Sequence, residues 1–252
     1  MDALIIAAGY GSRLADISPS KPLTPVAGVP LIELGARQAR SAGVSRLTVV
    51  TGHEAERVEA FLPGLATRLG MTIVAERIGD WSKPNGYSVM AGAARIAAAG
   101  GGDFLLMMAD HIFSAGILRR LAGQGGTDRD VTLAIDTRID SELIDPDDAT
   151  WVQRDAADRI LAIGKTITGY DCVDCGAFLA TQHLPAAIAA AIDAGKSGSL
   201  SDGMQYLADR GRAMVMDIGT DERDAWWMDV DDPRAHALAE QLAPRMLAEV
   251  YA

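Results

Sequence analysis

Several residue types that can bind a phosphate chain follow one another near the start of the sequence. After an apolar run at residues 4–8 come two glycines, a hydroxyl and two cations: Gly9, Gly11, Ser12, Arg13 and Lys21. Glycine allows backbone N–H groups to approach a phosphate chain closely, and Arg and Lys can neutralise its charge. The pattern predicts a binding site for a nucleoside triphosphate.

Two other glycine motifs do not fit this segment. A dinucleotide-binding fingerprint requires a third glycine where Leu14 stands, and an acidic residue about 20 positions further on, at the end of a second strand. It also requires a helix directly after the glycines, which closely spaced prolines prevent: Pro19, Pro22, Pro25 and Pro30. A Walker loop would require a Gly-Lys-Ser/Thr sequence, which does not follow. What remains is a long loop from about Gly9 to Pro30, and such loops in compact domains are usually functional.

Two aspartates are candidates for holding a divalent cation. Asp110 follows an apolar run at residues 104–108, and Asp229 lies between a short strand-like run and the last helical stretch. Mg²⁺ takes oxygen ligands and bridges phosphates, so these carboxylates suit a nucleotide site. The alternative is helix capping, for which Asp232, directly before a proline, is better placed than Asp229. We expect His111 to support a metal-binding residue or to serve packing, and not to bind a metal itself.

Asn85 and Gly86 form a third candidate position. They precede a helical stretch at residues 87–98 and do not join two strands, so a hairpin turn is not expected. An Asn side chain and exposed backbone groups at the start of a helix could contact the edge of a nucleobase. The alternative is a simple Asn-Gly turn.

The two cysteines, Cys172 and Cys175, have the C-x-x-C spacing of a redox site or of half a zinc site. Zinc would need two further ligands, and no second C-x-x-C or H-x-x-x-H motif is present. The pair lies in an apolar, strand-like run, whereas a thioredoxin-like motif opens a helix. We therefore expect structural thiols, with a free thiol near a ligand as the alternative.

Strand and helix signals alternate in the first half of the chain. The predicted strands are residues 3–8, 46–51, 72–76, 104–109 and 130–136. The predicted helices are residues 31–42, 54–69 with an interruption at Pro63, 87–98 and 115–123. Apolar strands indicate a sheet with helices on both faces. The alternation predicts an α/β fold, a Rossmann-like mostly parallel sheet whose ligands bind beyond the carboxyl ends of the strands.

The second half is less regular. Strands are predicted at residues 148–154, 159–163, 173–180, 213–217 and 226–228, with a hairpin turn around 155–158. Helices are predicted at residues 184–194, 200–210 and 233–250. We find no linker and no repeat. We therefore expect a single domain over residues 1–252, with a nucleotide-binding half at about 1–125 and an acceptor-binding half at about 126–252.

The composition limits the classes of partner. The chain has 252 residues, 49% of them hydrophobic, and a formal net charge of −11. The negative charge argues against nucleic acid and anionic membranes, but not against a phosphorylated small molecule bound by a local cluster of cations. No apolar run approaches the roughly 20 residues of a membrane span. The Met-Asp start lacks the features of a signal peptide, so we expect a cytoplasmic protein.

These motifs, taken together, resemble those of the sugar-phosphate nucleotidyltransferase family. The resemblance covers essentially the whole chain and rests on residues 7–14, 21–23, 28–32, 85–86, 109–110, 164–165, 174–176 and 227–231. Other segments are similar to those of inositol-1-phosphate cytidylyltransferases: residues 49–52, 85–88, 109–111, 147–150, 163–165 and 199–203. The resemblance implies a GT-A-like fold with a small acceptor-binding lobe. It also implies Mg²⁺-dependent transfer from CTP to inositol 1-phosphate, which gives CDP-inositol and pyrophosphate.

The resemblance implies a role for each candidate residue. The leaving phosphates would be held by Arg13 and by the backbone at Gly9, Gly11 and Ser12. Lys21 would stabilise charge on the α-phosphate, and Asp110 and Asp229 would bind Mg²⁺. The pyrimidine would be framed by Ala7, Ala8, Asn85 and Gly86. The acceptor would be held by Lys165, Asp174 and Gly176.

Two alternatives to this function stay open. The acceptor could be a sugar 1-phosphate, phosphocholine or an aminoalkylphosphonate in place of inositol 1-phosphate. The chain could also be a non-catalytic, nucleotide-binding regulatory domain, although such domains usually lose the Arg, the Lys or a metal-binding carboxylate. The sequence makes no prediction of oligomeric state.

Overall fold

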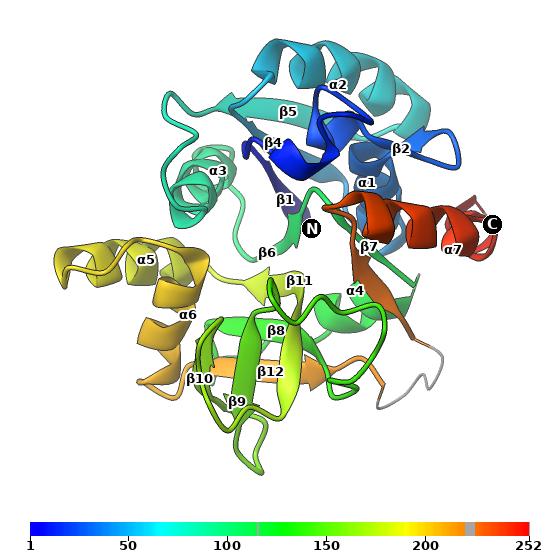
Figure 1. Cartoon of the computed structure of the whole chain (residues 1–252). Helices are drawn as coiled ribbons and strands as arrows, with labels where there is room; N and C mark the ends of the chain where they lie inside the picture. Colours follow the sequence, from blue (N-terminus) through cyan, green and yellow to red (C-terminus); the bar gives the residue numbers. More distant parts are fainter. Residues whose placement is uncertain (115, 220–224, 252) are drawn as a thin grey trace.

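A computed structural model describes residues 1–114, 116–219 and 225–251 (Figure 1). Parallel strands form the part of the sheet that the first half of the chain supplies, in the order β6-β1-β4-β5. Their bounds are Asp2–Ala7 (β1), Arg46–Thr51 (β4), Thr72–Arg77 (β5) and Phe104–Met108 (β6). The predicted α/β fold with a mostly parallel central sheet is confirmed.

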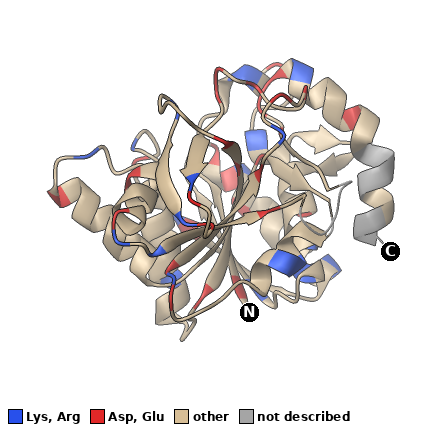
Figure 2. Ribbon diagram, turned by 90° about the horizontal axis from the view of Figure 1, so that it is seen from below, with Lys and Arg blue, Asp and Glu red and all other residues tan. Residues whose placement is uncertain are grey.

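Helices cover both faces of this sheet, because its strands are apolar on both faces. The side chains of β1 alternate: Ile5 packs in one hydrophobic core, and Leu4 packs in another on the opposite face. The helices of the first half are α1 (Leu31–Ser41), α2 (Ala55–Leu69), α3 (Gly86–Ala98) and α4 (Gly116–Ala122). In Figure 2 most of the strand ribbon carries no charge, and charged residues gather on the loops and helices around it.

The second half joins the sheet through a long antiparallel strand, β11 (Cys172–Ala180), which pairs with β6, β8 and β9. The other elements are β8 (Val131–Asp136), β9 (Trp151–Arg154), β10 (Ile160–Gly164), α5 (His183–Asp193), α6 (Leu200–Ala208) and β12 (Ala213–Asp217). The predicted hairpin is confirmed: β9 and β10 are antiparallel, and Asp155 Oδ1 accepts a hydrogen bond from the backbone N–H of Arg159.

A small antiparallel ribbon lies beside the sheet and was not fully predicted. Its strands are β7 (His111–Phe113) and β13 (Trp227–Asp229), and α7 (Pro233–Tyr251) follows. Trp226, Met228 and Val230 pack with Leu31 and Leu34 of α1 in a third hydrophobic core. The pairing sets Asp229 opposite His111. It therefore brings a residue near the end of the chain next to the carboxyl end of β6.

Three local predictions need correction. Pro63 does not interrupt α2, because it lies on the exposed face while Leu62 and Leu65 beside it are buried and hold the helix on the sheet. The strand expected from residue 148 begins only at Trp151, because a hydrogen bond from the Asp148 N–H to the Asp145 carbonyl forms a turn. The long loop contains 3-10 turns at Ser12–Leu14 (η1) and Lys21–Leu23 (η2), and a two-stranded hairpin of β2 (Pro25–Val26) and β3 (Val29–Pro30).

No helix in the described part of the chain is both long enough and apolar enough to cross a membrane.

Candidate active site

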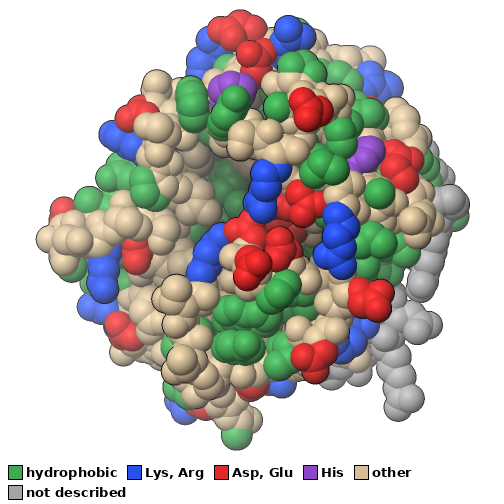
Figure 3. All heavy atoms as spheres, in the orientation of Figure 1, with side chains coloured by type: hydrophobic (Ala, Val, Ile, Leu, Met, Phe, Trp, Pro, Cys, Tyr) green, Lys and Arg blue, Asp and Glu red, His purple; other side chains and the backbone are tan. Residues whose placement is uncertain are grey.

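Two adjoining cavities lie at the carboxyl ends of β1 and β6. The larger has a volume of about 260 Å³ and the smaller about 180 Å³. The wall that they share is formed by Lys21, Asn85, Met108 and Asp110. Figure 3 shows a hollow in the centre of this face, with acidic side chains at its edge and basic side chains around them. This is the position where ligands bind in open α/β sheets.

The glycine-rich loop after β1 borders the smaller cavity. Ala7, Ala8, Gly9 and Gly11 line it. Gly11 has the left-handed backbone angle φ of 60°, and a Cβ atom there would lie 2.5 Å from Cβ of Lys21. The absence of a side chain at Gly11 thus lets Lys21 pass over the loop. Ser12, in contrast, is exposed on η1 and does not line either cavity.

Lys21 forms an ion pair with Asp110, at the wall between the cavities. Burial alone would lower the pKa of Lys21, but Asp110 and Asp229 raise it above its usual value. Burial would raise the pKa of Asp110, yet Lys21 and His111 hold it well below its usual range. Both groups are therefore charged at neutral pH, as binding a phosphate and a metal requires.

Asp110, His111 and Asp229 form a cluster that could hold a metal ion. His111 Nδ1 lies 2.8 Å from an oxygen of Asp110 and 3.7 Å from Oδ1 of Asp229. Asp229 Oδ1 is buried and has no hydrogen-bond partner among the described residues. Burial and the neighbouring Asp110 raise the pKa of Asp229 to about 7. An unpartnered buried oxygen among crowded carboxylates fits a divalent cation.

His111 belongs to this cluster and also packs against its neighbours. Its ring stacks on Trp227 with a centroid separation of 5.8 Å, as packing predicts. Burial alone would lower its pKa, but Asp229, Asp110 and Asp174 raise it to about 9. Gly176 makes room for the ring, because a Cβ atom at Gly176 would overlap it.

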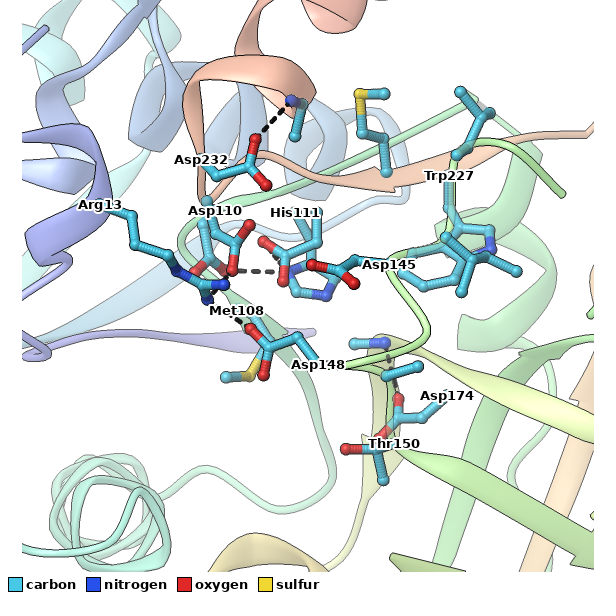
Figure 4. A pocket seen from close by; sticks show the side chains of 18 of the residues that line it. Arg13, Met108, Asp110, His111, Asp145, Asp148, Thr150, Asp174, Trp227 and Asp232 are labelled. Carbon is cyan, nitrogen blue, oxygen red and sulfur yellow. Dashed lines mark hydrogen bonds and ion pairs between the residues drawn. The ribbon is translucent and has the colours of Figure 1, made fainter. Parts of the chain in front are cut away.

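Asp148 bridges two cations from different parts of the chain, of which Figure 4 shows Arg13. It pairs with Arg13, which follows β1, and with Lys165, which follows β10. Arg13 also pairs with Asp231, which is buried. Burial alone would raise the pKa of Asp148, but Lys165 and Arg13 hold it well below its usual range. Arg13 and Lys165, which were expected to bind phosphates, are thus held by carboxylates.

Neither Asp148 nor Asp231 was among the predicted site residues. Both lie in segments that the resemblance singled out, residues 147–150 and 227–231, and that was the available signal. Burial and the Asp148 carboxylate raise the pKa of Asp231 to about 6.

The predicted acceptor residues lie on the wall of the larger cavity that the second half supplies. Lys165, Asp174 and Gly176 all line it, together with Thr150 and Ser201. Asp174 Oδ1 accepts a hydrogen bond of 2.7 Å from the Gly176 N–H, and burial raises the pKa of Asp174 to about 6. Its other oxygen is thus a candidate acceptor for hydroxyl groups of a ligand.

Asn85 and Gly86 begin α3 and have different surroundings. Asn85 lines both cavities, and its Oδ1 accepts a hydrogen bond of 2.8 Å from the N–H of Leu200. This bond orients the amide. Gly86 is buried and lines neither cavity. A Cβ atom there would overlap the carbonyl oxygen of Gly198, so Gly86 allows close packing of the helix start.

The cysteines lie away from this chemistry. Cys172 and Cys175 are both buried on β11, and they pack in the cores on opposite faces of the sheet. Burial raises the pKa of each thiol above its usual value. Their side chains therefore diverge and stay protonated, in agreement with structural thiols.

Comparison with known proteins agrees with this geometry. A family described as MobA-like NTP transferase domain matches residues 3–163. A bifunctional IPC transferase and DIPP synthase of Rubrobacter xylanophilus is 31% identical over 95% of this chain and 51% of that protein. A protein of the same description from Archaeoglobus fulgidus is 29% identical over 71% of this chain and 32% of that protein. The chain thus spans about half of the first relative and about a third of the second.

Solved structures share the fold over nearly the whole chain. An inositol-1-phosphate CTP transferase from T. maritima has a TM-score of 0.80 at 24% identity and covers 98% of this chain and 96% of its own. A UDP-glucose pyrophosphorylase has a TM-score of 0.77 at 16% identity and covers 97% and 98%. At these identities the likeness shows the fold, and the residues of the site carry the functional argument.

Proposed function

This chain belongs to the MobA-like NTP transferase domain family of nucleotidyltransferases, and we propose that it transfers the cytidylyl group of CTP to inositol 1-phosphate. The observation that carries the proposal is the contact of Lys21 with Asp110 at the wall between two cavities. The smaller cavity would hold the nucleoside of CTP, and the larger would hold the acceptor. The α-phosphate would then lie where the cavities meet.

The reaction is an in-line displacement at the α-phosphorus of CTP. An oxygen of the acceptor phosphate forms the new bond to this phosphorus, the bond to the oxygen that bridges to the β-phosphorus breaks, and pyrophosphate leaves. A phosphate monoester has a second pKa of about 6, so it is mostly dianionic at pH 7 and needs no general base. Catalysis then consists of positioning the phosphates and stabilising their charge.

The residues on each side of the wall have distinct tasks in this proposal. Lys21 donates to the α-phosphate and stabilises its charge in the transition state. Arg13 and the loop at Gly9, Gly11 and Ser12 hold the leaving phosphates. The pyrimidine lies between the loop and the start of α3, which contribute Ala7, Ala8, Asn85 and Gly86. Gly86 acts indirectly, because its close packing places Asn85.

The acceptor half contributes a cation and hydroxyl-binding groups. Lys165 binds the acceptor phosphate, which requires that it leave Asp148. Asp174 accepts hydrogen bonds from acceptor hydroxyls, and Gly176 holds Asp174 through its N–H. A cytidylyl donor and an inositol phosphate acceptor are supported by the T. maritima neighbour, an inositol-1-phosphate CTP transferase, and by the Rubrobacter relative, an IPC transferase and DIPP synthase.

We propose that Asp110 and Asp229 hold Mg²⁺, because Asp229 Oδ1 is buried without a hydrogen-bond partner among the described residues. The bound ion would supply positive charge for the phosphates. His111 keeps Asp110 oriented through the 2.8 Å contact with its carboxylate.

The test is pyrophosphate release in the presence of Mg²⁺. CTP, UTP, dTTP, ATP and GTP are each combined with inositol 1-phosphate, glucose 1-phosphate, phosphocholine and 2-aminoethylphosphonate. We expect release only with CTP and inositol 1-phosphate. Release with another pair keeps the reaction and replaces the substrates. No release across the grid, with CTP still bound, contradicts the transferase proposal and favours a regulatory nucleotide-binding domain.

A further inference from the structure

Three aromatic side chains gather beside the smaller cavity. Tyr10, His53 and Trp81 follow β1, β4 and β5, which are neighbouring parallel strands. The ring centroids of Tyr10 and His53 lie 4.6 Å apart, those of His53 and Trp81 5.1 Å, and those of Tyr10 and Trp81 6.0 Å. Because each residue follows the carboxyl end of its strand, the cluster lies at the edge of the sheet where the glycine-rich loop lies.

The cluster is exposed although its rings are large. Trp81 is 42% exposed and Tyr10 is 52% exposed, in a chain with only 5% aromatic residues. Exposed aromatic groups that lie together, at the edge of a cavity, are typical of binding sites. In Figure 3 hydrophobic side chains lie beside a histidine above the central hollow.

Trp81 is held in place despite its exposure. A Cβ atom at Gly52 would lie 2.7 Å from Cβ of Trp81 and 2.9 Å from Cβ of Ala8, so the glycine lets these segments pack closely. The next residues are fixed as well, because Asp80 Oδ1 accepts hydrogen bonds from the N–H and the hydroxyl of Ser82. A rigid aromatic face loses little conformational entropy when a ligand binds.

Trp81 also lines the smaller cavity, which has a volume of about 180 Å³. Small side chains and glycines form other parts of this wall, among them Ala8 and Gly9. The remaining lining includes Asn85 and Ser88, whose polar groups could contact the edge of a base. A cavity lined by small residues and by an indole suits a planar ring.

We propose that the nucleobase of the bound nucleoside triphosphate stacks on Trp81, with Tyr10 and His53 packed against the indole. This inference rests on the proposed nucleotide site, but it needs only nucleotide binding and not transfer. Stacking tolerates any base, because every base has a π-face. Trp81 therefore supplies affinity for the base. Polar groups such as Asn85 and Ser88 determine the selectivity among bases.

The experiment compares a ligand that contains a nucleobase with a ligand that contains none. Binding of CTP and of inorganic tripolyphosphate is measured by calorimetry, with Mg²⁺ and without acceptor, for wild type, Trp81→Ala, Trp81→Phe and Tyr170→Ala. We expect Trp81→Ala to weaken CTP binding by about 10- to 100-fold and to leave tripolyphosphate binding unchanged. Trp81→Phe keeps a ring and should retain most of the affinity. Tyr170 is the control: it stacks on Trp151 and lines neither cavity.

The outcomes separate this inference from the proposed function. If Trp81→Ala weakened the binding of CTP and of tripolyphosphate equally, the role of Trp81 would be structural. If it left CTP binding unchanged, Trp81 would have no role in binding. Each result overturns the inference. A wild-type chain that binds tripolyphosphate but not CTP also overturns it. A wild-type chain that binds CTP through Trp81 but releases no pyrophosphate overturns the proposed function and leaves this inference standing. A wild-type chain that binds neither ligand overturns both.

Discussion

Lys21 is the residue on which the proposed chemistry depends most directly. Its side chain is 16% exposed, and it pairs with Asp110 where the two cavities meet. A cation fixed before the substrate arrives can stabilise charge in the transition state without a cost of reorganisation. The pairing also explains how a lysine in a long loop is positioned.

We expect Lys21→Met to lower kcat for pyrophosphate release by about 100-fold or more, in the range found when a charge-stabilising donor is removed. The variant should keep its circular dichroism spectrum, because Asp110 retains its contact with His111. Arg57→Met is the control, since Arg57 is an exposed residue of α2 that pairs with Glu54. A kcat within tenfold of the wild-type value would contradict the role given to Lys21.

Asp148 forms ion pairs with the cations that a substrate phosphate would have to bind. Its carboxylate pairs with Arg13 and Lys165, and Arg13 also pairs with Asp231. This carboxylate thus takes the position at the two cations that a phosphate would take. A binding anion has to replace these ion pairs, so part of its interaction energy is used for the exchange.

We therefore expect Asp148→Asn to bind pyrophosphate more tightly than wild type, by about 3- to 10-fold, since partly exposed ion pairs contribute modest energies. Calorimetry at low ionic strength measures this. Asp147→Asn is a matched control: it removes the same charge one residue away, at an exposed position that does not line the larger cavity. Weaker binding by Asp148→Asn would show that the carboxylate supports the anion site and does not compete with the ligand.

Among the elements, α3 positions the base side of the site because its first turn packs tightly. A Cβ atom at Gly86 would overlap the carbonyl oxygen of Gly198 and lie 2.9 Å from a methyl group of Ile188. Asn85, one residue earlier, is bound to the N–H of Leu200 at the start of α6. The start of α3 and the start of α6 are therefore held together.

We expect Gly86→Ala to lower the free energy of unfolding by about 1–3 kcal/mol, the usual cost of overpacking. Urea unfolding at pH 7 measures the difference from wild type. Gly102→Ala is the control, because a Cβ atom there would meet nothing within 4 Å. Equal stability of the two variants would mean that the contact with Gly198 relaxes at little cost, and only the hydrogen bond of Asn85 with Leu200 would then join α3 to α6.

At the scale of the whole molecule, the two proposed halves share one core. Leu105 and Met107 of β6 pack in the same core as Ala177 and Leu179 of β11, and the two strands pair directly. Without the second half, the nucleotide-binding half at about 1–125 would expose the edge of its sheet at β6. The single domain over residues 1–252 stays a prediction, and this shared core favours it.

We expect one cooperative unfolding transition, with equal calorimetric and van't Hoff enthalpies in differential scanning calorimetry. Saturating CTP with Mg²⁺ should shift the whole transition upward, because a ligand that binds only the folded state stabilises all of it. Two separate transitions, of which only one moves with CTP, would instead show two domains that fold independently.

The sequence by itself determined the long strands β1, β4, β5 and β6, the helices of the first half and the order of the motifs. Apolar runs such as residues 46–51 are buried on both faces, so their periodicity and length were sufficient to find β4 with its observed bounds. The glycine-rich loop at the edge of the smaller cavity could be found as well, since glycines after a buried strand and two nearby cations are a local pattern. These features depend on neighbours in the chain, and a single sequence contains them.

Only the tertiary structure decided which charged side chains lie in contact with one another. Asp229 reaches Asp110 because a short ribbon pairs β13 with β7, and β7 has too few residues for a periodic signal. Asp148 lies in a turn far from Arg13 in the chain, and their contact exists because β9, β10 and β11 carry that turn to the edge of the sheet. Gly86 lines neither cavity and makes room for Gly198, and Gly176 lines the larger cavity and also makes room for His111. Electrostatic and steric contacts of this kind depend on distances in space, which the spacing of residues along a chain does not specify.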